Sequence, residues 1–141
     1  MKKKGFSLLE TIFVLCVVAV ILSVAVSKFD TALDNTNLTK VKSDILQIRA
    51  GISLMKNKLI LRNQNETLEQ LDDNNDLLFN LILDTPIIAT TTNTINSWKK
   101  TSNTTYNVYI QKDTSIIFTY DQNTFTFDCD NSNSLCAELN I

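Results

Sequence analysis

The chain has 141 residues, which leaves room for one modest domain, and any membrane segment reduces its water-soluble core further. Its net charge of −2 and its 20% of charged residues create no positive field, so we do not expect a nucleic-acid partner. It has no histidine and only two glycines, which excludes Ser/Cys–His catalysis and histidine-ligated zinc and disfavours glycine-rich phosphate loops. We therefore do not expect an enzyme.

An apolar run with a basic start opens the chain. Residues 12–26 are almost wholly apolar, and counted from Phe6 the run would span roughly 30 Å as a helix, one hydrocarbon core. Lys2, Lys3 and Lys4 precede it, and this cluster favours a cytoplasmic N-terminus with the rest of the chain exported. Without these three lysines the remaining chain would carry a net charge of about −5.

Glu10 is the unusual residue of this run, because a carboxylate inside a spanning helix costs about 2.5–3.5 kcal/mol at mid-bilayer. A shallow position, with the carboxylate among the headgroups, is one explanation. The other starts from Gly5 and Phe6, a small and an aromatic residue between which a peptidase could cut and create an α-amino group. Phe6 precedes Glu10 by one helical turn, so both charges lie on one face. Such a pair, about 4 Å apart, is worth on the order of 4 kcal/mol at an effective dielectric of about 20.

The basic leader, Gly5, Phe6, Glu10 and the apolar helix that follows resemble the N-terminus of type IV prepilins and pseudopilins. The resemblance covers roughly the first thirty residues and implies that a prepilin peptidase cleaves after Gly5 and methylates the new amine of Phe6. It also implies that Glu10 pairs with the Phe6 amine of a neighbouring subunit during filament assembly. Many members of the family carry a helix-bending proline where this chain has Ser27.

The resemblance further implies a function, a location and a set of partners. The chain would be a structural subunit, a pilin or pseudopilin, of a type IV pilus-like or type II secretion filament. It would cross the bacterial inner membrane once, with its N-terminus in the cytoplasm and its C-terminal region in the periplasm or outside the cell. Its partners would be the prepilin peptidase, other pilin or pseudopilin subunits and the inner-membrane assembly platform.

Two other functions stay open. An ordinary secretory signal also has a lysine-rich start and an apolar core, and Ala-Val-Ser at 25–27 offers a small-x-small cleavage site, which would release an exported soluble protein. A DNA- or ligand-binding minor pilin of a competence system is the other alternative. In that case Trp98, Lys99 and Lys100 would contact the partner together with the Asn- and Thr-rich loops.

Residues 28–62 are predicted to continue the apolar helix as its amphipathic half. Apolar residues recur there at alternating steps of three and four, as on the face of a helix that packs on a sheet. A coiled coil would need the same spacing. The polar residues at 34–37 are the weak stretch of this helix. The apolar positions are Leu38, Val41, Ile45, Ile48, Ile52, Met55 and Leu59.

Residues 63–141 are predicted to form an α+β region. Asp76 is expected to cap a short helix at 77–83 that ends before Pro86, and the polar run at 72–75 is expected to be a solvated loop. Polar and apolar residues alternate along three later runs, which predicts an antiparallel sheet with one apolar face. These runs are 105–111, 114–121 and 124–129.

The three cysteines have different expected roles. Cys16 lies in the apolar run, where packing against neighbours explains it. Cys129 and Cys136 lie in the exported part, so a disulfide is expected to close the short loop between them and to add about 2–3 kcal/mol by loop entropy. A disulfide-closed C-terminal loop also resembles the corresponding region of many pilins. Asp128 and Asp130 occupy the place where many pseudopilins bind calcium, but neither a metal nor another cofactor is expected.

The predicted organisation has four parts. In chain order they are a cytoplasmic leader at 1–5, a transmembrane or filament-core helix at 6–27, the amphipathic half of the helix at 28–62, and a periplasmic α+β region with a C-terminal disulfide loop at 63–141. The predicted fold class is α+β, with a long N-terminal helix packed on a small antiparallel sheet of three to four strands. No Walker, Rossmann or hydrolase-elbow motif is present, so no catalytic residue is assigned.

Overall fold

The longest element of the computed structural model is the helix α1 (Leu8–Leu61), with 54 residues. The structure describes residues 8–62, 67–73, 76–111, 114–130 and 132–139, without the side chains of 27–35 and 138. The backbone is helical through the polar stretch at 34–37, which the sequence marked as weak. By its internal contacts the chain divides into an N-terminal unit (Met1–Asn35) and a globular unit (Thr36–Ile141).

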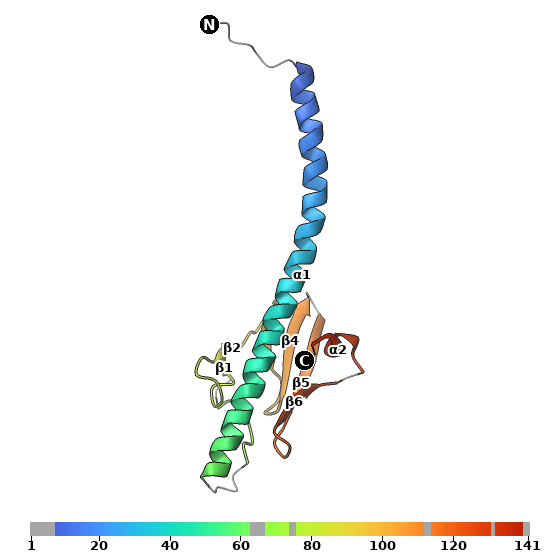
Figure 1. The fold of residues 1–141 in the computed structure, drawn as a ribbon. Helices are drawn as coiled ribbons and strands as arrows, with labels where there is room; N and C mark the ends of the chain where they lie inside the picture. Colours follow the sequence, from blue (N-terminus) through green and yellow to red (C-terminus); the bar gives the residue numbers. More distant parts are fainter. Residues whose placement is uncertain (1–7, 63–66, 74–75, 112–113, 131, 140–141) are drawn as a thin grey trace, which may run out of the picture. The chain divides into compact units, whose positions relative to one another are not determined.

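The globular unit contains an antiparallel sheet of four strands in the order β3-β4-β5-β6 (Figure 1). A separate two-stranded sheet pairs β1 with β2, and α2 follows β6. This arrangement confirms the predicted α+β fold with a small antiparallel sheet. The elements are β1 (Leu77–Leu78), β2 (Ile87–Ile88), β3 (Trp98–Lys100), β4 (Thr105–Gln111), β5 (Thr114–Asp121), β6 (Thr126–Cys129) and α2 (Ser134–Leu139).

The alternation of polar and apolar residues predicted the bounds of β4 and β5 correctly. The last strand is shorter than predicted, because β6 begins at Thr126 and not at Thr124. Phe125 has a φ of 60°, in the left-handed region, and its amide donates to the Asp121 carbonyl at 2.8 Å. The two residues before Thr126 therefore belong to the turn from β5.

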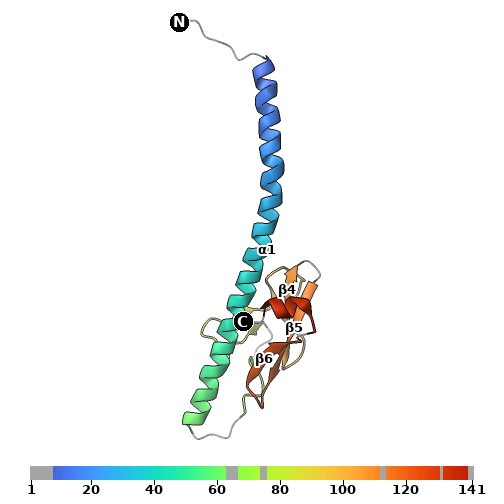
Figure 2. The same ribbon diagram turned by 45° about the vertical axis from the view of Figure 1, so that its right-hand side comes forward.

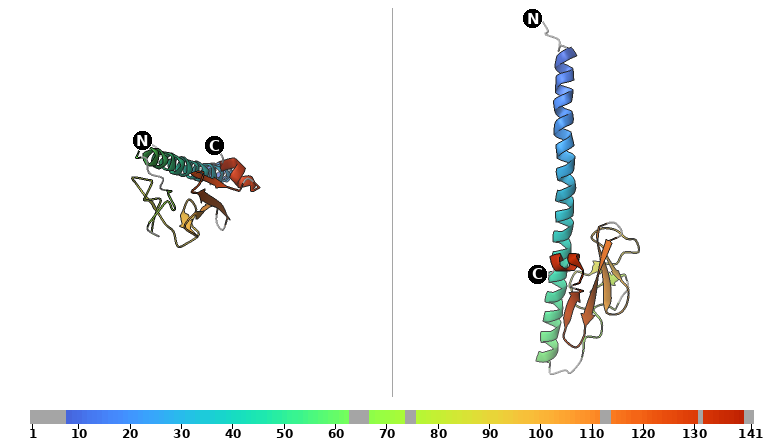
Figure 3. Two further views of the ribbon diagram at one scale, coloured as in Figure 1. Left: turned by 90° about the horizontal axis from the view of Figure 1, so that it is seen from below. Right: turned by 90° about the vertical axis from the view of Figure 1, so that its right-hand side faces the viewer.

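The core lies between the four-stranded sheet and the part of α1 that belongs to the globular unit. Figure 2 and the two views of Figure 3 show the sheet along one side of that part of the helix. Val41, Ile45, Ile48 and Ile52 are at most 1% exposed, which confirms the centre of the predicted apolar stripe. Fully burying one such side chain contributes about 1.5–3 kcal/mol. The sheet and the β1–β2 segment supply the aromatic side of the core, namely Phe79, Trp98, Tyr106, Phe118 and Phe127.

The predicted helix at 77–83 is wrong. β1 and β2 pair there across a short connection, and this pairing places Leu78 in the core. Phe79 follows with a φ of 61°, which ends the strand, and its carbonyl accepts amide hydrogen bonds from Ile82 and Leu83. A helix of so few residues is marginal in isolation, so the burial of Leu78 and Phe79 decides the local structure.

Gly51 allows α1 to pass close to the connection between β1 and β2. A Cβ atom on this residue would lie 2.6 Å from the carbonyl oxygen of Ile82, far closer than an ordinary contact. The neighbour is backbone, which cannot rotate away as a flexible side chain can. The glycine therefore permits the close contact between the helix and this connection.

Gly51→Ala is expected to lower the free energy of unfolding by about 1–2 kcal/mol, because the methyl group forces the Ile82 backbone to move. The expected sign is opposite to the ordinary helix preference, which favours alanine over glycine by about 1 kcal/mol. Urea denaturation of the full chain in detergent, followed by the fluorescence of the single tryptophan, measures the change. Ser53→Ala on the exposed face of α1 is the matched control. Equal or higher stability of Gly51→Ala would contradict the close contact.

Arg49 of α1 closes the β6 edge of the sheet. Its Nε donates to the Phe127 carbonyl at 3.1 Å, and its Nη2 binds Asp128 Oδ1 at 2.7 Å. An edge strand presents unpaired peptide groups that invite pairing with other chains. The guanidinium satisfies one of these groups and also fixes the helix to the sheet.

Candidate functional site: the N-terminal apolar segment

Leu8–Val26 is the one segment of the described chain that is long and apolar enough to cross a membrane. It has 19 residues, a mean hydropathy of 2.8, and no buried part. At about 1.5 Å per residue the segment is roughly 28 Å long, close to the thickness of a hydrocarbon core. A removable signal sequence near the N-terminus passes the same test of length and composition.

The segment is apolar on every side. Leu9 is 79% exposed, Leu15 68% and Ile21 61%, although these three side chains point in different directions around the helix. The two hydroxyl groups of the segment bind the backbone of their own helix, Thr11 to Leu8 and Ser23 to Val20, both at 2.8 Å. A helix of this kind needs lipid or other apolar helices around it.

Glu10 is the only charged residue of the segment, and it lies in the first turn of α1. Its side chain is exposed, and no hydrogen bond or ion pair of its carboxylate occurs within the described residues. The first turn is favourable for a negative charge by about 0.3–1 kcal/mol, which is less than the cost of a carboxylate in a bilayer. The helix alone does not compensate the Glu10 charge in an apolar environment.

The two predicted processing residues, Gly5 and Phe6, lie outside the described residues, as does the side chain of Ser27. Of the three residues assigned to processing and assembly, the structure places Glu10 only. Cleavage after Gly5 and pairing of the Phe6 amine with Glu10 therefore stay predictions.

Cys129 and Cys136 lie at disulfide distance, with their Cα atoms 5.9 Å apart. Cys129 ends β6, and Cys136 lies in α2, where it is fully buried. The sequence predicted only a loop here, but Asn133 starts a short helix, because its Oδ1 accepts the Leu135 amide at 3.0 Å. The pair therefore ties α2 to the last strand, and Leu139 of α2 reaches the core.

The two aspartates beside the cysteine pair already have partners within the protein. Asp128 binds Arg49, and the Asp130 Oδ1 accepts the Ser132 amide at 2.9 Å. This backbone hydrogen bond lowers the pKa of Asp130 below its ordinary value. Within the residues that the structure describes, no three His, Cys, Asp or Glu side chains come together as metal ligands would.

A buried polar cluster around Asp72 was missed by sequence reasoning, which placed 72–75 in a solvated loop. Asp72 is fully buried. One of its oxygens binds the Lys100 Nζ, and the other accepts the Tyr106 hydroxyl at 2.7 Å and the Phe79 amide at 3.4 Å. The strand pattern of β3 and β4 places Lys100 opposite Tyr106, but no sequence signal connects this pair to Asp72.

Trp98 does not offer a stacking surface for bases. It is fully buried, and its indole N–H donates to Asp44 of α1 at 3.1 Å. Lys100 is engaged by Asp72, so of the three residues considered for contact with a ligand only Lys99 remains. The alternative in which all three contact nucleic acid does not fit this geometry.

Comparison of the chain with known protein families, with curated proteins and with solved structures gave no match. The resemblance to pilins therefore rests on Gly5, Phe6, Glu10 and the apolar segment. Of these, Glu10 and Leu8–Val26 have a described structure.

Proposed function

We propose that the chain is a structural subunit of a filament of the type IV pilin and pseudopilin class. One observation carries the proposal: the segment Leu8–Val26 is apolar on every side, and its single charge, Glu10, lies in the first turn of the helix. A membrane surrounds such a helix before assembly, and the apolar helices of neighbouring subunits surround it in the filament. A helix with this composition has no stable place in water.

The proposed assembly contact is between Glu10 of one subunit and the Phe6 amine of its neighbour. Cleavage after Gly5 by the prepilin peptidase creates this amine, which is largely cationic near neutral pH. The charge pair offsets the cost of placing the Glu10 carboxylate in an apolar surrounding, since both terms are about 3–4 kcal/mol. A subunit in the wrong axial position would bury the carboxylate without an amine, so the pair fixes the register of the filament.

The globular unit is proposed to lie on the periplasmic or extracellular side. The lysine cluster before the apolar segment favours this orientation. The cysteine pair of the globular unit suits an oxidising compartment. Other subunits and the inner-membrane assembly platform are the proposed partners of the chain.

Glu10→Val is expected to leave cleavage intact and to abolish filament assembly, because the Phe6 amine loses its partner and the register is no longer fixed. Intact mass of the membrane-bound protein reports cleavage, and recovery of the chain in the sheared filament fraction reports assembly. Thr11→Val, one residue further along the exposed helix surface, is the matched control and is expected to assemble normally. Unchanged assembly of Glu10→Val would remove the role proposed for the carboxylate.

The secretory-signal alternative predicts a different mature chain. A signal peptidase would cut behind the apolar segment, near Ser27, and remove Glu10 with it. Glu10→Val would then affect export and not assembly. The N-terminus of the mature protein separates the two functions directly.

A further inference from the structure

β3 is the second edge strand of the four-stranded sheet, and the described residues cover only part of its outer edge. The Ser97 carbonyl accepts the Tyr109 amide at 3.1 Å, and the Thr101 amide donates to the Thr105 carbonyl at 2.9 Å. These odd-numbered residues direct their peptide groups toward β4. In an antiparallel pair the alternate residues face the other way, so the peptide N–H and C=O of Lys100 point away from β4.

The chain before β3 covers Trp98 but stops short of Lys100. Ala89 forms a parallel bridge with Trp98, and the Thr90 amide donates to the Trp98 carbonyl at 2.9 Å. A continuing parallel strand would next direct the Thr92 amide toward Lys100. The Thr92 amide instead donates to the Thr90 Oγ1 at 3.2 Å, because the threonine-rich segment turns back on itself.

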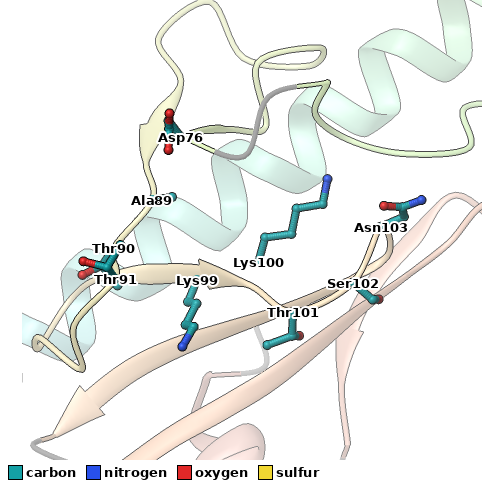
Figure 4. Close-up of a pocket in the computed structure, with 9 residues that line it drawn as sticks. All are labelled: Asp76, Ala89, Thr90, Thr91, Lys99, Lys100, Thr101, Ser102 and Asn103. Carbon is teal, nitrogen blue, oxygen red and sulfur yellow. The ribbon is translucent and has the colours of Figure 1, made fainter.

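A pocket of about 550 Å³ lies where this short partner segment leaves the sheet (Figure 4). One wall is formed by β3 and the turn after it, residues 99–103, and the opposite wall by Asp76 and residues 89–91. Apart from Ala89, the lining side chains are hydroxyl, amide or charged groups. The pocket has no aromatic or large apolar residue, so its chemistry suits a ligand that forms hydrogen bonds along a strand.

Lys99 favours a ligand that places a carboxylate on its side of β3, whereas Asp76, on the opposite wall of the pocket, disfavours a carboxylate there. Figure 4 shows the side chains of Lys99 and Lys100 on opposite sides of β3. The ammonium of Lys100 is matched by the buried Asp72, whereas Lys99 forms no ion pair with any described residue. Among the described residues Lys99 is thus the cation without an ion-pair partner beside the outward-facing peptide groups of Lys100.

We propose that this open edge of β3 binds an extended, acidic peptide segment of a partner protein. The peptide adds as a strand beside Lys100, where its backbone pairs with the outward-facing peptide groups, and places a carboxylate near Lys99. At the opposite edge of the sheet Arg49 already occupies the Phe127 carbonyl, so a peptide would have to displace this hydrogen bond there. The site lies wholly within the globular unit, so it does not depend on the role proposed for the N-terminal segment.

The test uses the full chain in detergent micelles and a fluorescein-labelled hexapeptide of alternating valine and glutamate, read by fluorescence anisotropy. Saturable binding is expected, with about tenfold weaker binding when glutamine replaces each glutamate. A peptide with the same side chains and methylated backbone nitrogens is expected not to bind, since it keeps the charge but cannot pair as a strand. No saturable binding up to about 1 mM, or equal binding of the methylated peptide, overturns the proposal.

Lys99→Glu is expected to weaken binding of the glutamate peptide by at least about tenfold. Lys58→Glu makes the same charge change on the exposed surface of α1 and is expected to leave binding within about twofold of the original chain. Unchanged Trp98 fluorescence shows that both variants are folded. An equal loss of peptide binding in the two variants would show that the peptide is attracted by the net charge of the chain alone. That result would overturn the proposed binding site.

Discussion

Asp72→Ala is expected to lower the free energy of unfolding of the globular unit by about 3–5 kcal/mol. The carboxylate is fully buried and binds three donors, the Lys100 ammonium, the Tyr106 hydroxyl and the Phe79 amide. Alanine removes the counter-charge of the Lys100 ammonium. The Lys100 side chain is only 12% exposed, so water does not replace the lost carboxylate. Alanine also leaves the other two donors without an acceptor, and each such buried group costs about 1–3 kcal/mol when unpaired.

The Tyr106 hydroxyl is held in its donating form. Burial raises the pKa of Tyr106 well above its ordinary value, and the hydrogen bond to Asp72 and the charge of that carboxylate raise it further. The hydroxyl therefore depends on Asp72 as its acceptor. The Phe79 amide, which belongs to a residue in the left-handed region, depends on the same carboxylate.

The measurement is urea denaturation of the full chain in detergent, followed by Trp98 fluorescence. Asp128→Ala removes the other described ion pair, whose carboxylate side chain is 57% exposed, and is expected to cost about 1 kcal/mol or less. Replacing the three side chains with Asp72→Leu, Lys100→Met and Tyr106→Phe is expected to recover much of the loss, because only the Phe79 amide is then left without its acceptor. A loss for Asp72→Ala no larger than that for Asp128→Ala would contradict the role of the cluster.

Removal of the cysteine pair, by Cys129→Ala with Cys136→Ala, is expected to lower the free energy of unfolding by about 2–3 kcal/mol. The bond closes a short loop, which restricts the unfolded chain, and ties α2 to β6. Cys136 is fully buried and Leu139 is 1% exposed, so loosening α2 also exposes part of the core. Alanine avoids placing a serine hydroxyl in this apolar position.

Dithiothreitol should lower the stability of the original chain by the same amount and leave the double variant unchanged. Cys16→Ala, which removes the exposed cysteine of the N-terminal segment, is the control and should not alter the response. Alkylation under denaturing conditions should add one label before reduction and three after it, as expected for one free cysteine and one bonded pair. Three labels before reduction would contradict the disulfide.

The long helix and the strands β4 and β5 could be predicted from the sequence because their signals are local. The spacing of Val41, Ile45, Ile48 and Ile52 predicts which side of α1 is buried. The alternation along β4 and β5 likewise gives their bounds and their inward-facing residues. Glu10 could be selected as a candidate site residue because a charge in an apolar run has a cost that needs an explanation.

The features that sequence reasoning missed depend on contacts between distant segments. Asp72 resembles any loop aspartate until Lys100 and Tyr106 are brought to it by the sheet. Leu77 and Leu78 have an apolar pattern that fits a helix or a strand, and pairing with β2 decides between the two. The contact that requires Gly51 also appears only when the β1–β2 connection is placed beside α1.

Intact-mass and N-terminal analysis of the protein recovered from native membranes tests the proposed filament role most directly. We expect a chain that begins at Phe6, carries one methyl group on its α-amine and retains Glu10 with the whole apolar segment. A chain that begins at Lys28 would show that the apolar segment is a removable secretory signal, and a chain that retains its leader would show that Gly5 is not a processing site. Either result would contradict the proposed processing.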